Sequence, residues 1–72
     1  MPHEVQAEMV ANVWKIVVVV GDSVADGDTL LILESMKMEI PVLAERAGTV
    51  TEVAVTEGDV VQEGDILVIL EI

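Results

Sequence analysis

The residue with the clearest chemical potential in this chain is Lys37, which stands between two methionines in the segment Glu34-Ser35-Met36-Lys37-Met38-Glu39. Only three of the 72 residues are basic, whereas fourteen are acidic. A strand-like apolar run precedes the lysine at positions 30–33, and another follows it at 40–43. Lys37 is therefore predicted at the turn of a β-hairpin, where its amine protrudes and is open to covalent modification.

A less specific interpretation is that Lys37 merely solubilises a hairpin tip and that Met36 and Met38 fill the core. Hairpin turns favour Asn, Gly or Asp, however, and none of these occurs at positions 35–38. At least one methionine beside a tip lysine must face outward, where a flexible thioether can contact a partner. We therefore expect Met36 and Met38 to be recognition elements of the turn, with Glu34 and Glu39 flanking them.

No other residues have the spacing of a catalytic or metal site. Cysteine is absent, which excludes disulfides and thiol chemistry, and the only histidine, His3, stands alone near the N-terminus. Asp22, Asp26 and Asp28 resemble the start of a calcium loop. The closing glutamate of such a loop would fall at position 33, which is Leu33. We expect no metal ligand and no catalytic residue, so the chain is predicted not to be an enzyme.

The charge of the chain limits its partners. The formal net charge is −11, and Lys15, Lys37 and Arg46 cannot form the basic patch that a phosphate backbone requires. Nucleic acid and anionic membranes are therefore disfavoured. No apolar run approaches the roughly 18 residues of a membrane span, and the N-terminal residues show no basic segment followed by an apolar core, as a signal peptide would. We expect a cytoplasmic, monomeric protein kept soluble by its charge.

The apolar residues favour strands over helices. They make up 53% of the chain and are mostly β-branched or aliphatic, with Trp14 as the only aromatic. The apolar spacing at 13, 16 and 18 and again at 50, 53 and 55 predicts a β-bulge near 14–15 and another near 51–52. The runs 30–33 and 67–70 are apolar on both faces and are expected to be buried. Residues 1–4 are expected to fray.

The chain also contains an internal repeat. Shifted by 37, residues 7–35 align with residues 44–72, and 13 of the 29 pairs are identical. Four Gly-Asp pairs fall in register and mark equivalent turns. We predict one all-β domain over residues 1–72, a flattened barrel or sandwich of about eight short strands, built from two pseudo-two-fold related halves, 7–35 and 44–72. Under this shift Lys37 maps just outside both chain ends, so the termini and Lys37 should lie at opposite ends.

Two motifs carry a family resemblance. Residues 7–15 read A-E-M-x-A-x-V-W-K, and residues 20–39 read V-G-D-x-V-x-x-G-D-x-L-L-I-L-E-S-M-K-M-E. Over residues 5–72 the chain resembles the biotinyl (biotin carboxyl carrier) domain family. The resemblance implies the barrel-sandwich hybrid fold that biotinyl and lipoyl domains share, and biotin in amide linkage on Lys37. Glu8 and Glu45, where the family often has proline, and Ala11, where it usually has glycine, depart from the pattern.

The resemblance also implies partners. In the family a biotin protein ligase transfers biotin from biotinyl-adenylate to the lysine, and the biotin then carries a carboxyl group between biotin carboxylase and carboxyltransferase centres. The chain is then a carrier, either a small free-standing biotinylated protein or an excised domain. Two alternatives stay open: a lipoyl domain, although those typically have D-K-A or D-K-V at this turn, and an unmodified acidic β-module that binds a protein partner.

Overall fold

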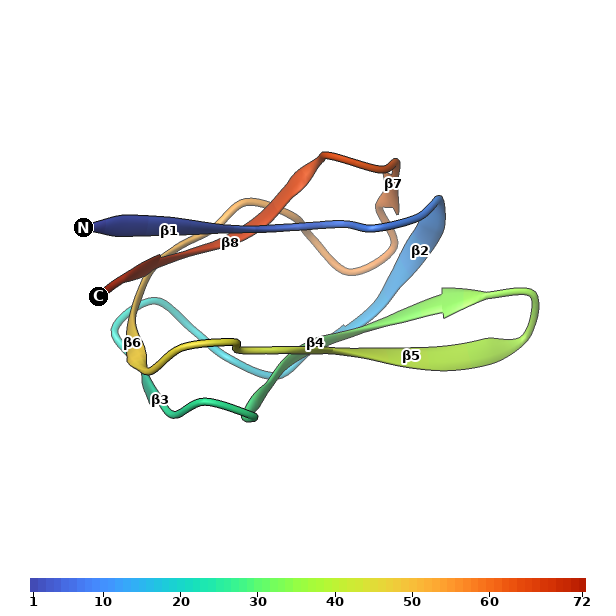
Figure 1. Ribbon diagram of the computed structural model, residues 1–72. Helices are drawn as coiled ribbons and strands as arrows, with labels where there is room; N and C mark the ends of the chain where they lie inside the picture. The colour runs from blue at the N-terminus through green and yellow to red at the C-terminus, as the bar shows by residue number, and fades with distance from the viewer.

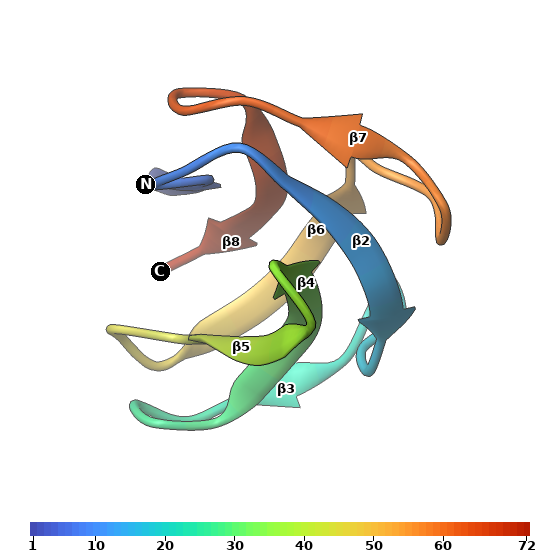
Figure 2. The same ribbon diagram turned by 90° about the vertical axis from the view of Figure 1, so that its right-hand side faces the viewer.

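The computed structural model describes residues 1–72 and contains eight strands and no helix. The strands are β1 (Pro2–Gln6), β2 (Ala11–Ile16), β3 (Ser23–Val24), β4 (Thr29–Ser35), β5 (Met38–Leu43), β6 (Gly48–Val53), β7 (Val60–Val61) and β8 (Ile66–Glu71). They form two antiparallel sheets with the orders β1-β8-β6-β3 and β5-β4-β2-β7. Figure 1 shows the elongated molecule from the side, and Figure 2 looks onto the end at which the β4–β5 turn lies and shows the strands arranged around the interior. The all-β, flattened barrel-sandwich prediction is confirmed.

The two sheets are equivalents of each other. A shift of 37 residues carries β1 onto β5, β2 onto β6, β3 onto β7 and β4 onto β8. The order β1-β8-β6-β3 thereby becomes β5-β4-β2-β7, which is the order of the second sheet. Both predicted bulges are present, because the register shifts between Val13 and Lys15 in one half and between Val50 and Glu52 in the other.

Four turns of the barrel are built from the Gly-Asp pairs. Their glycines have φ angles between 91° and 98°, in the left-handed region that suits a residue without Cβ. Each following aspartate accepts a hydrogen bond from the backbone N–H three residues earlier, as Asp22 does from Val19 at 2.9 Å and Asp28 from Ala25 at 2.8 Å. Asp59 and Asp65 do the same in the second half. These carboxylates therefore stabilise turns.

The core is entirely apolar. Fifteen residues are buried, none of them polar, and the largest side chains with almost no exposure belong to β4 and β8 or face them: Leu30, Leu31, Leu67, Leu70, Val13, Val50 and Val68. Strands β4 and β8 are buried on both faces as predicted, except that Ile32 and Ile69 are half-buried. No helix of the structure has the length and apolar character needed to cross a membrane.

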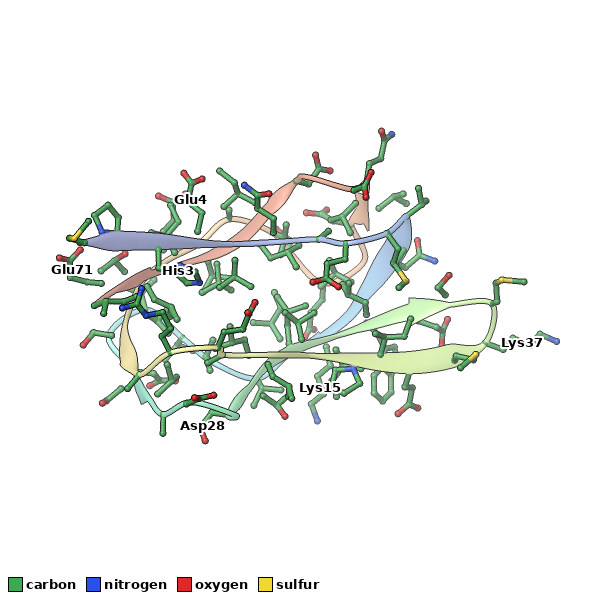
Figure 3. All side chains as sticks on the ribbon, in the orientation of Figure 1. His3, Glu4, Lys15, Asp28, Lys37 and Glu71 are labelled. Atoms are coloured by element: carbon green, nitrogen blue, oxygen red, sulfur yellow. The ribbon has the colours of Figure 1, made fainter.

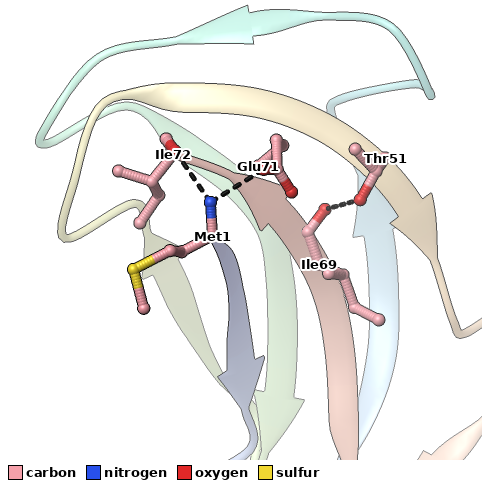
Figure 4. A network of polar contacts seen from close by, with 5 residues as sticks. All are labelled: Met1, Thr51, Ile69, Glu71 and Ile72. Atoms are coloured by element: carbon pink, nitrogen blue, oxygen red, sulfur yellow. Dashed lines mark hydrogen bonds and ion pairs between the residues drawn. The ribbon is translucent and has the colours of Figure 1, made fainter.

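The expectation that residues 1–4 fray is wrong. Pro2–Gln6 forms β1, which pairs with β8 along its length. Figure 4 shows the N-terminal amine of Met1 bonded to Glu71 Oε1 at 2.7 Å and to the carbonyl of Ile72 at 3.0 Å. The physical reason is the two-fold relation, because residues 1–6 are the equivalents of 38–43 and complete the sheet around β8. Only the identical pairs Met1/Met38 and Val5/Val42 signal this in the sequence.

The termini and Lys37 lie at opposite ends of the molecule, as the repeat predicts. The molecule measures 32 × 18 × 17 Å along its principal axes. Both chain ends lie at one end of the long axis in Figure 1, and Figure 3 shows Lys37 at the other. The domain assignment over 1–72 stays a prediction.

Substitution of Gly48 tests how closely β6 and β8 approach each other. A Cβ at position 48 would lie 2.6 Å from the carbonyl oxygen of Glu71, a backbone atom that cannot swing aside. Gly48→Ala should therefore force β6 and β8 apart and cost about 1–3 kcal/mol, the usual cost of overpacking, measured by urea unfolding. Thr49→Ala, at the next and exposed position, should change stability by at most about 0.5 kcal/mol. Equal stability of Gly48→Ala and the unaltered protein would contradict the close approach.

Candidate functional site

Lys37 lies in the turn of the hairpin formed by β4 and β5. The two strands pair up to Ser35 and Met38, which leaves Met36 and Lys37 as a two-residue turn. Their φ angles are 52° and 63°. Positive φ at both central residues is the signature of a type I′ turn, whose twist matches that of the flanking strands. The sequence prediction that Lys37 occupies a hairpin turn agrees with this geometry.

This turn is strained. Met36 and Lys37 are the only non-glycine residues of the chain with positive φ. For a residue with a Cβ, the left-handed region costs roughly 1–2 kcal/mol, and type I′ turns for that reason favour Asn-Gly. Strain of this kind persists where the surrounding structure enforces it, and it is concentrated at functional sites. The strain thus marks the same two residues that the sequence singled out.

The side chains of the turn face solvent. Met36 is 92% exposed, Met38 is 65% exposed, and Lys37 is exposed as well. Figure 3 shows Lys37 extending away from the barrel. The lysine forms no ion pair, since the only salt bridge of the protein joins the N-terminal amine to Glu71. Its amine is therefore free to react, and the two thioethers beside it are free to contact a partner.

Glu34 and Glu39 lie directly opposite each other on β4 and β5, one position below the residues that close the turn. Because side chains alternate between faces, both carboxylates point to the face opposite that of the buried Leu33. Like charges at opposing positions of a sheet repel, and no lysine or arginine pairs with either. The base of the tip therefore presents unpaired negative charge.

Other residues considered from the sequence lie away from the tip. Lys15 is on β2 opposite Ile32, and His3 is on β1, near the termini. No group of three or more His, Cys, Asp or Glu side chains is arranged to hold a metal ion. The structure thus brings together the residues 34–39 and leaves the rest dispersed.

Two surface hollows exist, and neither contains Lys37. One, of about 230 Å³, lies between β1 and β5. Its apolar lining comes from Val5, Met9, Leu33, Ile40, Val42 and Leu43. The other, of about 590 Å³, runs beside β1, and four of its nine lining residues are glutamates: Glu4, Glu8, Glu45 and Glu63. Sequence reasoning missed Met9, because only the approach of β1 to β5 reveals the groove that it lines. Lys37 thus lies outside both hollows, at the exposed tip of the hairpin.

Comparison with known sequences gives a family match over nearly the whole chain. The model of the biotin/lipoyl family, described as "Biotin-requiring enzyme", matches residues 1–70. Relatives include a homolog of biotinylated protein TB7.3 from Mycolicibacterium smegmatis, 61% identical over 44 residues, which are 61% of this chain and 62% of the relative. The biotin/lipoyl attachment protein of Bacillus subtilis is 52% identical over 40 residues, 56% of this chain and 55% of that protein. The matched segment thus spans less than two thirds of these relatives.

Solved structures with similar folds come from large and small proteins. Urea carboxylase from Kluyveromyces lactis matches 99% of this chain with a TM-score of 0.92 and 34% identity, although the match covers only 6% of that enzyme. The lipoyl domain of the 2-oxoglutarate dehydrogenase complex from Azotobacter vinelandii matches 86% of this chain and 78% of its own length, with a TM-score of 0.74 and 29% identity. The fold is therefore similar to both, and the carboxylase segment superposes more closely.

The strain at the tip can be measured by substitution. Met36→Asn places a residue that tolerates positive φ in the turn and removes no buried surface, because Met36 is 92% exposed. The variant should gain about 1 kcal/mol of unfolding free energy, measured by thermal and urea denaturation. As the control, Met9→Asn should lower stability because Met9 lines the apolar groove. A loss of stability in Met36→Asn would mean that the turn is not strained as described.

Proposed function

Because the chain belongs to the biotin/lipoyl attachment family, we propose that it is a biotin carboxyl carrier with biotin in amide linkage on Lys37. The observation that carries the proposal is the exposed amine of Lys37, held in a strained turn between two exposed methionines. Bound there, biotin would supply a ureido nitrogen that accepts and releases a carboxyl group. The protein's own residues hold and present it.

The residues at the tip fit such a group. Amide formation needs a primary amine that a second protein can enclose, and Lys37 has neither an ion pair nor a pocket around it. No histidine, cysteine or other base bonds to its side chain, so the proton that the amine loses has to be taken by the ligase. The chain is accordingly a carrier and not itself a catalyst.

The shape of the molecule suits transfer between two centres. The long axis of 32 Å separates the termini from Lys37. An arm at the tip can therefore enter an active site while the opposite end stays outside or tethered. Biotin carboxylase and carboxyltransferase components are the proposed partners, and a net charge of −11 favours partners with basic surfaces. Flexible methionine side chains can adapt to each partner in turn.

Biotin is favoured over lipoate. The relatives from Mycolicibacterium smegmatis and Mycobacterium tuberculosis are named as biotinylated proteins. The urea carboxylase segment superposes with a higher TM-score than the lipoyl domain does. Met36 and Met38 also differ from the D-K-A or D-K-V turn typical of lipoyl domains. Intact mass after expression of the protein beside a biotin ligase distinguishes the biotinylated, lipoylated and unmodified forms.

Substitution of the lysine tests the site directly. Lys37→Arg keeps the positive charge and the exposure but removes the primary amine, so it should fold normally and incorporate no biotin in streptavidin blots. Lys15→Arg is the matched control, since Lys15 is also an exposed lysine but lies on a strand. It should be labelled as well as the unaltered protein. A streptavidin signal from Lys37→Arg would assign the biotin to another residue.

The role of the methionines is tested by truncation. A double substitution of Met36 and Met38 by Ala should cost far less than the roughly 2–5 kcal/mol of a buried methionine, because both are exposed. The same variant should be loaded more slowly by the ligase or transfer carboxyl groups less well. Urea unfolding and initial rates of biotin incorporation check the two effects separately. A large drop in stability would show that the side chains belong to the core.

A further inference from the structure

The methionines beside Lys37 are among the most exposed large apolar residues of the protein. Met36 is 92% and Met38 is 65% exposed, on either side of the lysine. The other two methionines differ in place: Met9 is 40% exposed in the groove between β1 and β5, and Met1 is 86% exposed at the opposite end. Two of the four sulfur atoms therefore lie in solvent at the residue that is to be modified.

These methionines contribute little to the fold. No methionine is among the fifteen buried residues, and Met36 occupies a backbone conformation that costs free energy for any residue with a Cβ. A change in the chemistry of the two sulfurs therefore leaves the core intact. The same change alters the surface that a ligase has to enclose when it reaches Lys37.

We propose that Met36 and Met38 form a peroxide-sensitive modification site, where oxidation to methionine sulfoxide prevents the loading of biotin onto Lys37. This inference rests on the proposed function and adds to it a means of regulation. The oxidant is a hydroperoxide. The dithiols of methionine sulfoxide reductases can reduce the resulting sulfoxide back to the thioether.

The oxidation needs only the methionine thioether and hydrogen peroxide, and no other group of the protein takes part. The sulfur lone pair attacks one oxygen of hydrogen peroxide, an S–O bond forms and the O–O bond breaks. Sulfur loses two electrons, the peroxide gains them, and the departing hydroxide takes the proton of the transferred oxygen to leave as water. The sulfoxide is reduced in a separate reaction, in which two thiols of a reductase become a disulfide and the sulfoxide oxygen leaves as water.

The effect on loading follows from desolvation. A thioether is apolar and bends to fit a partner, whereas a sulfoxide is polar and chiral. When the ligase closes around Lys37, each sulfoxide has to give up its hydration without a designed hydrogen-bond partner. A single such penalty corresponds to about a tenfold loss of rate. The melting temperature should not change, because the side chains do not pack in the core.

The experiment uses the unbiotinylated full chain. The protein is treated with graded hydrogen peroxide, the peroxide is removed with catalase, and the sulfoxides are located by peptide mass mapping. Met36 and Met38 should be oxidised before Met9, in line with their exposure. The initial rate of biotin incorporation should fall about tenfold, and treatment with both stereospecific sulfoxide reductases should restore it.

Two variants are the matched controls. The Met36→Leu/Met38→Leu protein, compared with its own untreated rate, should be insensitive to peroxide, because leucine is apolar and cannot be oxidised in this way. Met9→Leu should respond to peroxide as the unaltered chain does. If the untreated protein takes up no biotin, the proposed function itself fails. If it is loaded and the mapped sulfoxide form is loaded equally fast, or if Met9 is oxidised first, only the present inference is overturned.

Discussion

The structure depends on one constraint, which is that β4 and β8 are apolar on both faces and cannot be covered within one half of the chain. Leu30, Leu31, Leu67 and Val68 are fully buried. The two halves also satisfy each other's backbone. Val13 donates to the carbonyl of Asp59 and accepts from Gly58, and Val50 makes the equivalent bonds with Asp22 and Gly21. The halves are thus interlocked by hydrogen bonds as well as by apolar burial, and neither is complete alone.

This interlocking explains why a strained turn is tolerated at the tip. The four Gly-Asp turns use residues that suit their conformation, with glycine at positive φ and an aspartate that accepts a backbone hydrogen bond. The turn at Met36 and Lys37 has neither device. It extends from β4, one of the two strands that are buried on both faces, so its cost is offset by the rest of the barrel. The same hairpin therefore has a base that packs in the core and a tip whose side chains face solvent.

Ion pairs contribute little to the stability of the fold. The fourteen acidic residues are almost without cationic partners inside the protein, and the only ion pair joins the chain ends. Glu34 and Glu39 oppose each other below the tip, where their repulsion reduces stability. A surface of this kind is unfavourable for the isolated domain, because its like charges repel one another. Lys37 is then a cation presented above a negative surface.

The sequence by itself determined the strands other than β1, the bulges, the two-fold repeat and the position of Lys37 in a hairpin turn, because each is encoded within a few residues or in the shift of 37. The turn at Lys37 could be located from its flanking apolar runs, and its unsuitable residues already indicated a functional tip. Only the tertiary structure decided that residues 2–6 form a strand, since β1 exists by pairing with β8, sixty or more residues away. The groove lined by Met9 likewise requires β1 and β5, which are far apart in the chain, to be brought side by side. Local patterns encode conformation, but edge pairing and surface hollows arise from contacts between residues distant in the chain, whose stabilisation no local window contains.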